Sequence, residues 1–441
     1  MATTITPQIV TVNTAVQTAP SVSQLQQSGA IVSTGGTTLA ANAYQYCGNL
    51  AAVQAILSPG LSLTSISWLS GVVTATATAA LSLATGQTFT TTISGAVPTG
   101  YNGTYVATVT GADTFTYALA TNPGTETAPG TYLPNNAAFV IDAATTFFAQ
   151  GTQLGVYILE LGSQTSATAS ITALQTWITG NSSPQVFYSY LLPRAWDANA
   201  AASLNTMTTN YSSAEGQTYF FITTTSTNVS TYASNKAVFA LVPSPTAAST
   251  EEQAAVPFYQ WTLNNPGPGN VLAPMAYRYG YGVTPWVQQG NSTTIQNVLT
   301  ANGNLILTGA QGGISTATLF RGTTMDGSQA AFWYGVDYFR TQVAQALSAA
   351  VIEGSNTQPP LLYNQAGINT LEAVANQIAA NAVAYGCAES ITVSAVPFTT
   401  YITQFPTNYA NGIYGGLSAS MVGQSGFLVI NFSLTAVAFP S

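Results

Sequence analysis

Two successive helical patterns in residues 320–389 constrain the fold of this chain more than any other part of the sequence. After a polar turn, apolar residues recur every three or four positions, which is the spacing of one face of an α-helix. Ser328 is the predicted N-cap of this first helix, and Gly354, Pro359 and Pro360 mark its end. The predicted apolar stripe of this helix consists of Phe332, Val336, Phe339, Val343 and Leu347.

A second helical pattern follows directly and ends at Gly386, in the position after a helix that glycine favours. Its apolar stripe consists of Ile368, Leu371, Ala375, Ile378, Ala382 and Tyr385. Two helices with complementary apolar faces, joined by a proline-containing loop, predict a helical hairpin packed on a sheet. The predicted core positions of this hairpin are Phe332, Val336, Phe339, Val343, Leu371 and Ile378.

The chain before the hairpin alternates between strand and helix patterns. Beyond a first strand that begins at Ile31, the predicted strands lie at 156–161, 186–191, 219–222, 238–242 and 305–307. The predicted helices lie at 49–57, 139–151, 169–178, 198–207 and 250–263, the last with Glu251 and Glu252 in its first turn. This alternation predicts an α/β (α+β) fold in which mixed, mostly parallel sheets are covered by helices.

Between the first and second predicted helices lies a segment with a different pattern. Four threonine-rich runs alternate with period two and are separated by glycine-rich turns, at 71–78, 86–94, 103–110 and 114–119. Pro59 and Pro134 bracket this segment, which predicts an inserted all-β module at 60–133. Its aromatic residues are expected to form its core, with a glycan-binding surface as the alternative: Phe89, Tyr101, Tyr105, Phe115 and Tyr117.

Charge is scarce throughout the chain. Only 4% of the 441 residues are charged, against an average of about 25% in globular proteins, and the net charge is −8. A surface so poor in charge has little protection against self-association. This indicates a subunit covered by copies of itself, with a secreted or cell-surface β-protein as the alternative. The five basic residues form no cluster, which argues against nucleic-acid binding: Arg194, Lys236, Arg278, Arg321 and Arg340.

The residues needed for most catalytic and metal sites are missing from the sequence. There is no histidine, and the two cysteines, Cys47 and Cys387, give neither a zinc motif nor a disulfide framework, so both are expected to be buried thiols. A glycosidase needs only two carboxylates, and Asp326 and Asp337 are the nearest candidates. However, Asp326 sits in a turn beside glycine, and an ion pair with Arg340 is the simpler account of Asp337. We therefore predict no catalytic residues, no metal and no cofactor.

Membrane segments are not expected either. Residues 1–7 lack the basic and apolar regions of a signal peptide. Residues 66–84 show the period-two alternation of a strand rather than the uniform apolarity of a spanning helix.

Both ends of the chain carry strand patterns without a local partner. A lone strand cannot satisfy its own backbone groups, so each must pair with a distant strand of its own chain or with another chain. The N-terminal run consists of Ile9, Val10, Thr11 and Val12. The C-terminal run, at 426–437, includes Phe427, Leu428, Val429, Ile430, Phe432 and Leu434.

An aromatic patch lies between the fifth predicted helix and the hairpin, at Tyr277, Tyr279, Tyr281 and Trp286. Such residues could stack on sugars or on single-stranded nucleic acid. Their alternation also places the tyrosines on one face of a strand, and we favour the interpretation that they pack against a neighbouring layer.

The hairpin resembles the C-terminal core of contractile-tail sheath proteins of bacteriophages. The resemblance rests on Gly-Thr-Thr-Met-Asp-Gly at 322–327, Gly-Ile-Asn-Thr-Leu-Glu-Ala-Val at 367–374 and Ala-Tyr-Gly at 384–386. The flanking segments fit as well, so that it covers 31–59 and 137–441, while the inserted module resembles a small β-module of phage virion proteins. The expected parts are an N-terminal arm at 1–27, a first sheath domain at 28–59 plus 134–245, the module at 60–133, a C-terminal core at 246–425 and a C-terminal arm at 426–441.

The resemblance implies a structural subunit that forms six-fold rings stacked helically around a tail tube. Contraction of this sheath would drive the tube through the host envelope without a cofactor. The implied partners are other copies of the chain, the tail tube protein, and baseplate and tail terminator proteins, with no nucleic acid and no direct membrane insertion. The implied location is the virion tail, after assembly in the host cytoplasm, with both arms pairing across subunits. Two alternatives remain: another virion protein of the tube or baseplate, and a secreted adhesin or glycan-binding protein.

Overall fold

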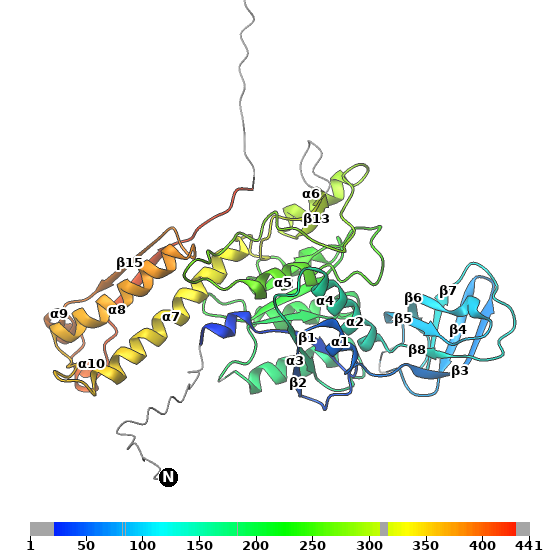
Figure 1. Cartoon of the computed structure of the whole chain (residues 1–441), viewed down its shortest axis with the longest axis horizontal. Helices are drawn as coiled ribbons and strands as arrows, with labels where there is room; N and C mark the ends of the chain where they lie inside the picture. Colours follow the sequence, from blue (N-terminus) through cyan, green and yellow to red (C-terminus); the bar gives the residue numbers. More distant parts are fainter. Residues whose placement is uncertain (1–21, 82, 84, 183, 309–315, 429–441) are drawn as a thin grey trace, which may run out of the picture.

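A six-stranded mixed sheet forms the centre of the molecule, in the order β12-β11-β10-β1-β9-β2 (Figure 1). The computed structural model describes residues 22–428, apart from 82, 84, 183, 309–315 and the side chains of residues 22–24 and 135. All strand pairs of this sheet are parallel except β2 with β9 at one edge. The strands are β1 (Gly29–Ser33), β2 (Tyr44–Cys47), β9 (Val156–Glu160), β10 (Ser189–Leu192), β11 (Tyr219–Thr223) and β12 (Val238–Leu241).

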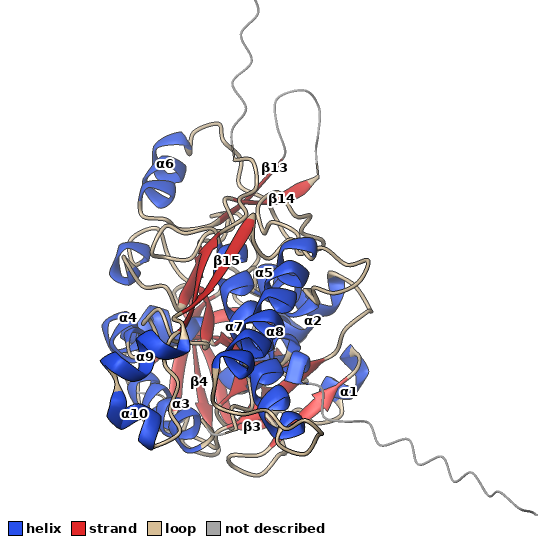
Figure 2. Ribbon diagram, turned by 90° about the vertical axis from the view of Figure 1, so that its left-hand side faces the viewer, coloured by secondary structure: helices blue, strands red, loops and turns tan. Residues whose placement is uncertain are grey.

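Helices cover both faces of the central sheet (Figure 2). The inner strands are buried along nearly their whole length, so alternate side chains feed two separate apolar cores. Ile31 and Phe221 belong to one core, and Val32 and Phe220 to the other. The first core packs against α1 (Leu50–Gln54), α2 (Asn135–Ala149) and α5 (Ala255–Leu263), and the second against α3 (Ala167–Gly180), α4 (Arg194–Thr209) and α6 (Ser292–Thr300). The predicted α/β fold with mixed sheets is confirmed.

The threonine-rich segment folds into a closed barrel at one end of the molecule (Figure 1). Its strand order is β3-β4-β7-β6-β5-β8, so the barrel has two strands beyond the four predicted runs. Phe89, Tyr101, Phe115 and Tyr117 lie in its own core, and Tyr105 stacks on Tyr117 with ring centroids 4.2 Å apart. The strands are β3 (Leu61–Leu69), β4 (Val72–Ala77), β5 (Thr88–Ser94), β6 (Gly103–Val109), β7 (Thr114–Ala118) and β8 (Thr131–Tyr132).

The predicted helical hairpin is present and projects from the opposite end of the molecule (Figure 1). It consists of α7 (Ala330–Gly354) and α8 (Gln365–Ala384). Gly386 ends α8 with φ +71°, while the N–H of Cys387 donates to the carbonyl of Ala382 at 2.9 Å, as expected of a helix that closes on a left-handed glycine. A two-stranded antiparallel sheet, absent from the predictions, packs on α8 and is formed by β15 (Ser390–Ala395) and β16 (Leu417–Val422). We call α7, α8, β15, β16 and the two short helices between those strands, α9 (Phe398–Gln404) and α10 (Pro406–Ala410), the arm.

Only the first part of α7 packs on the body of the molecule. It does so through Tyr334, Asp337 and Tyr338, which lie beside the predicted apolar stripe, and through Phe339, which belongs to that stripe. Of the predicted core positions, Phe339 is 8% exposed, whereas Phe332, Val336, Val343, Leu371 and Ile378 are half-buried.

The remaining short elements lie in different parts of the chain. β13 (Leu305–Thr308) and β14 (Ala317–Phe320) form a two-stranded sheet, and three 3-10 helices lie at η1 (Val22–Gln27), η2 (Thr99–Tyr101) and η3 (Val229–Tyr232). The predicted start of the fifth helix is wrong, because α5 begins at Ala255 and Glu251 and Glu252 precede it. Among the described residues, no helix is long and apolar enough to cross a bilayer.

Candidate assembly surfaces

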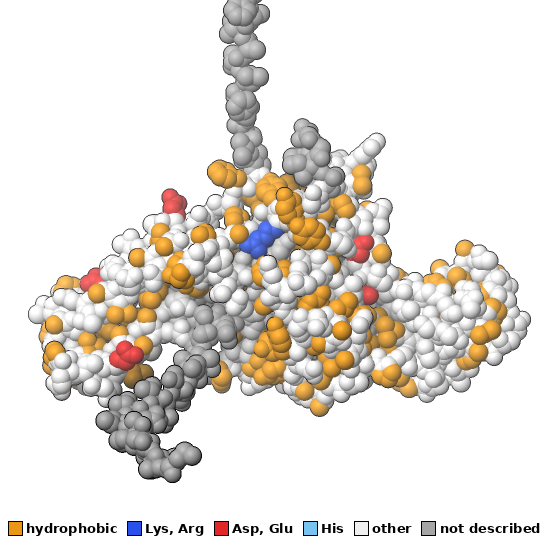
Figure 3. All heavy atoms as spheres, in the orientation of Figure 1, with side chains coloured by type: hydrophobic (Ala, Val, Ile, Leu, Met, Phe, Trp, Pro, Cys, Tyr) orange, Lys and Arg blue, Asp and Glu red, His pale blue; other side chains and the backbone are white. Residues whose placement is uncertain are grey.

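All five basic side chains are engaged in holding the fold together. Lys236 donates to three backbone carbonyls, of Ser213, Ala214 and Gly216, at 2.7–3.2 Å. Arg278 donates in the same way to the carbonyls of Pro274, Gln260 and Ala273 and to Asn264 Oδ1. The other three each donate to at least one backbone carbonyl: Arg194, Arg321 and Arg340. Figure 3 accordingly shows a face made almost entirely of uncharged side chains and backbone.

Both carboxylates that the sequence offers as glycosidase candidates accept hydrogen bonds from neighbouring residues. Asp337 is fully buried and accepts hydrogen bonds from the hydroxyls of Tyr188 at 2.9 Å and Tyr219 at 2.8 Å. Burial is the main cause that raises the pKa of Asp337 to about 6, against the lowering effect of these hydrogen bonds. The predicted ion pair with Arg340 is wrong, because Arg340 donates to the carbonyl of Glu215 instead.

The other glycosidase candidate, Asp326, closes the turn before α7. It accepts hydrogen bonds from Thr324 Oγ1 at 2.7 Å, Ser328 N at 3.0 Å and Trp333 Nε1 at 3.0 Å. Ser328 is therefore held by this carboxylate, and Gln329, not the predicted Ser328, is the N-cap of α7. Both candidate carboxylates therefore form hydrogen bonds within the packing around α7.

The sheet of the arm is the clearest candidate for contact with another chain. One face of β15 and β16 packs towards α8, and neither strand carries a charge or a proline. Within the described chain, the sheet contains only these two strands, so the outer edge of each is open. An open, uncharged edge is the geometry that accepts an added strand.

The terminal segments that could supply such a strand lie largely outside the description. Ile9, Val10, Thr11, Val12, Val429, Ile430, Phe432 and Leu434 fall outside the described residues. Phe427 and Leu428 are described: neither is in a strand, and Phe427 is 80% exposed. The predicted pairing of both ends across subunits therefore stays a prediction.

The tip of the arm carries an apolar surface. An apolar groove of about 510 Å³ opens between α7, α8 and the start of β16. The side chains that line it include Leu347, Val351, Leu361, Ile368, Leu371 and Tyr414. Around the tip, further large apolar side chains are exposed, namely Ile352, Leu362, Phe405, Tyr409 and Ile413.

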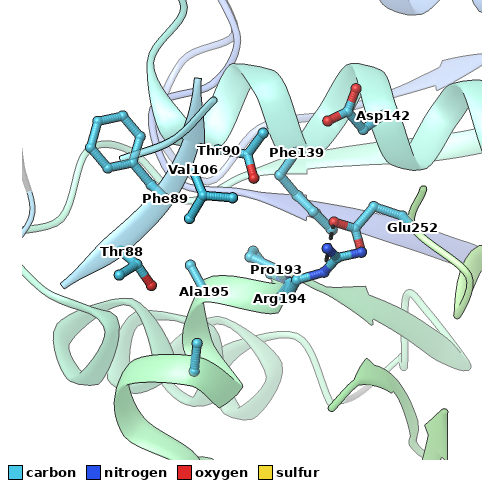
Figure 4. Close-up of a pocket in the computed structure, with 11 residues that line it drawn as sticks. Thr88, Phe89, Thr90, Val106, Phe139, Asp142, Pro193, Arg194, Ala195 and Glu252 are labelled. Atoms are coloured by element: carbon cyan, nitrogen blue, oxygen red, sulfur yellow. Dashed lines mark ion pairs between the residues drawn. The ribbon is translucent and has the colours of Figure 1, made fainter. Parts of the chain in front are cut away.

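The barrel rests on the body through β5, which contacts α2 and α4 (Figure 4). A cavity of about 100 Å³ separates them, and the Arg194 guanidinium faces Glu252 there at 3.4 Å. Beside it, Asn199 and Thr88 exchange two long hydrogen bonds of 3.4 Å each, next to a break in α4 at Ala200. We call this contact the barrel joint.

Asp142 lines the same cavity on α2. Burial raises the pKa of Asp142 to about 7, the negative charge of Glu252 adds to the rise, and the Arg194 guanidinium opposes it. The joint therefore contains a carboxyl group that changes charge near neutral pH.

The three tyrosines of the aromatic patch are more exposed than the predicted packing implies, and only the ring of Tyr277 packs on β14. Tyr277, Tyr279 and Tyr281 are 42%, 54% and 50% exposed, although the Tyr277 ring lies 5.7 Å from that of Phe320. Their backbone lies along β14: the N–H of Tyr277 donates to the carbonyl of Leu319 at 2.7 Å, and the N–H of Gly280 donates to the carbonyl of Ala317 at 2.9 Å. Trp286 behaves as predicted: it is buried and donates to the carbonyl of Val242 at 2.9 Å.

Comparisons with known proteins find relatives by structure alone. No protein-family model and no curated protein matches the chain. A chain in a six-fold symmetrised cryo-EM structure of the anti-feeding prophage baseplate has a TM-score of 0.56 and 11% identity, over 99% of this chain and all of that chain. A chain of the same baseplate in its contracted state has a TM-score of 0.50 and 12% identity, over 98% and 99% of the two chains.

A further similar structure is the sheath tail protein Lin1278 from Listeria innocua, with a TM-score of 0.43 and 9% identity over 83% of this chain and 88% of that protein. At sequence identities this low, the structural similarity shows a shared fold alone. Along nearly its whole length, the chain therefore has the fold of the matched chains in the two baseplate structures.

Proposed function

We propose that this chain is a structural subunit of a contractile phage-tail or prophage-tail sheath, polymerising with copies of itself around a tail tube. The main support for this proposal is the open β15–β16 sheet on the projecting arm. In addition, both ends of the chain are uncharged and carry strand patterns without a local partner. Adding a neighbour's terminal strand to this sheet would satisfy its open backbone groups.

The fold supports the same proposal. Chains that share it occur in a six-fold symmetrised structure of the anti-feeding prophage baseplate and in a structure of that baseplate in its contracted state. Stacked six-fold rings, a switch between two packings and passage of a tube through the host envelope belong to this proposal, with the tail as the location. No catalytic step and no cofactor take part in it.

The arrangement of the molecule supports a division of roles between its ends. The barrel and the arm lie at opposite ends of the body (Figure 1). We assign residues 60–133 to the outer surface of the sheath and the arm, with the segments 1–27 and 426–441, to contacts between subunits. Because the basic side chains are engaged internally, contact with the tube would rest on polar and apolar groups rather than on positive charge.

Electron microscopy of the purified protein tests the proposal. The full chain should form hollow cylinders, and replacing 60–133 by a Gly/Ser linker should leave cylinder formation intact. Removing 426–441 should abolish cylinders while the helices and central sheet still fold, and removing 1–14 should shorten them. A chain that stays monomeric at high concentration, or ordered cylinders of normal length after removal of 426–441, would contradict it.

A second candidate function is a baseplate subunit, because both structures with a TM-score of at least 0.50 reported above are baseplate structures. The two roles differ in the product of self-assembly. A sheath subunit builds cylinders of many stacked rings, whereas a baseplate subunit stops at a single ring. The length distribution in the same micrographs decides between them.

A further inference from the structure

The three exposed tyrosines form a rigid surface, which we call the tyrosine row: Tyr277, Tyr279 and Tyr281. Between the first two, Arg278 turns inward, and its guanidinium is held by three carbonyls and Asn264. Tyr277 has φ +61°, a conformation rarely adopted by residues with a side chain. The fold thus maintains an unusual backbone here while exposing the rings.

The backbone of the row is fixed by side chains from two helices. Gln150 Oε1 accepts from the N–H of Tyr281 at 2.9 Å, and Gln150 Nε2 donates to the carbonyl of the same residue at 2.8 Å. Gln260 Nε2 donates to the carbonyl of Tyr279 at 2.6 Å. These backbone groups are therefore occupied, and a partner would bind the row through the rings. Rigid aromatic rings of this kind are typical anchors of protein contacts.

The described chain ends against this row. Gly426 exchanges two hydrogen bonds with Gln329, at 2.8 and 3.0 Å, and the Tyr277 hydroxyl then donates to the carbonyl of Leu428. In Figure 3, hydrophobic side chains gather on the face where the described chain ends. Whatever follows Leu428 therefore starts within reach of the row.

The following residues, 429–441, carry no charge and include the apolar Ile430, Phe432 and Leu434 at alternate positions. At roughly 3.3 Å per residue, the stretch from Tyr277 to Tyr281 is about 13 Å long. Residues 429–441 are long enough to cover that distance. An apolar segment left in water recruits other chains. A tethered segment, in contrast, meets a surface of its own chain at an effective concentration on the order of millimolar.

We propose that, in the unassembled subunit, residues 429–441 lie on the tyrosine row of their own chain. The contact covers the apolar C-terminal segment and withholds it from other subunits until assembly. The later transfer to a neighbour's β15–β16 sheet rests on the proposed function, but the contact itself does not.

Disulfide trapping in the full chain tests this contact. The double variant Tyr279→Cys, Phe432→Cys is oxidised at a concentration where the protein is monomeric, and the linked peptides are identified by mass spectrometry. Cys47 and Cys387 are buried and stay in place. The control variant is Tyr46→Cys, Phe432→Cys, because Tyr46 is an equally exposed tyrosine on the edge strand β2. We expect the row pair to form an intrachain disulfide at least about tenfold faster than the control pair.

Equal rates for the two pairs would overturn the proposal, as would a disulfide that joins two chains, since the occupant would then be another copy. A second pair, Tyr281→Cys with Leu434→Cys, guards against a local effect of one substitution and should behave in the same way. Replacing all three row tyrosines by Ser should also lower the concentration at which cylinders appear. If no variant ever forms cylinders, the sheath function fails, while the trapping result still decides the contact.

Discussion

The barrel and the arm both project from one body, but all strands of the barrel are paired on both sides, whereas those of the arm each leave one edge open within the described chain. The barrel closes its six strands on themselves around a core of its own. The arm leaves a two-stranded sheet open, and α8 packs between α7 on one side and β15 on the other. Closure removes the backbone groups that recruit other chains, whereas an open edge presents them. This difference fits the proposed roles, in which the barrel is a self-contained module and the arm connects subunits.

The largest expected effect comes from placing charge on the open sheet. Thr392→Lys with Ser418→Lys puts one lysine on an exposed position of each arm strand. Lysine on an edge opposes the addition of a strand, so cylinder formation should fall at least about tenfold, measured by sedimentation and electron microscopy. The matched control is Thr74→Lys with Thr108→Lys, at exposed positions of two barrel strands. If the two variants assemble equally well, the open edge is not the connector.

The next effect concerns the two cores. Phe339 in α7 is 8% exposed and Phe115 in β7 is fully buried. Truncating either to Ala should cost about 3–5 kcal/mol of folding free energy. Phe339→Ala should destabilise the body and thereby reduce assembly, whereas Phe115→Ala should unfold the barrel in a separate, lower thermal transition and leave cylinders intact. A single shared transition for both variants in calorimetry would show that barrel and body fold as one unit.

A smaller effect is expected from pH at the barrel joint. The pKa of Asp142 is about 7 in the folded chain, above its ordinary value near 3.8, so the folded state holds this proton more tightly than the unfolded state. Its contribution to stability is therefore full below about pH 4 and is lost as the pH rises to about 7. Asp142→Asn should weaken the fall in stability across this range and make the protein more stable than the parent at pH 8.

Denaturant unfolding at several pH values measures this difference, and Glu353→Gln, at an exposed position of α7, is the control. The buried Asp337 contributes to the same pH dependence with a pKa of about 6, so the slope should be reduced but not abolished. A parent and an Asp142→Asn variant with parallel pH profiles would show that this carboxyl does not titrate in the joint.

Much of the fold could be predicted because its strands and helices carry strong periodic patterns. The buried strand at Val156–Glu160 and the paired helices α7 and α8 have apolar patterns that few other structures share. The arm strands were missed because they are short and half exposed: β15 reads Ser-Ile-Thr-Val-Ser-Ala, and its stability comes from packing on α8 rather than from its own composition.

The roles of single polar and aromatic residues could not be predicted, because they depend on neighbours that are distant in the sequence. The spacing of Asp337 and Arg340 predicts an ion pair, but it says nothing of the hydroxyls that Tyr188 and Tyr219 bring to Asp337. The alternation of the tyrosine row shows that its rings share one face of the backbone. It does not show whether a layer covers that face, and no described part of the chain does so fully.

The smallest effect should come from the hydrogen bonds that orient the barrel. Asn199 and Thr88 exchange two bonds of 3.4 Å, long enough that together they contribute at most about 1 kcal/mol. Asn199→Ala should therefore leave assembly and the body unchanged while the backbone amide of Thr88 exchanges with solvent faster, by roughly tenfold or less. Thr206→Ala is the control, since its hydroxyl bonds only within α4. Hydrogen exchange followed by mass spectrometry measures the change. If Asn199→Ala instead reduced cylinder formation, the orientation of the barrel would matter for contacts between subunits, and the barrel would be a connector as much as the arm.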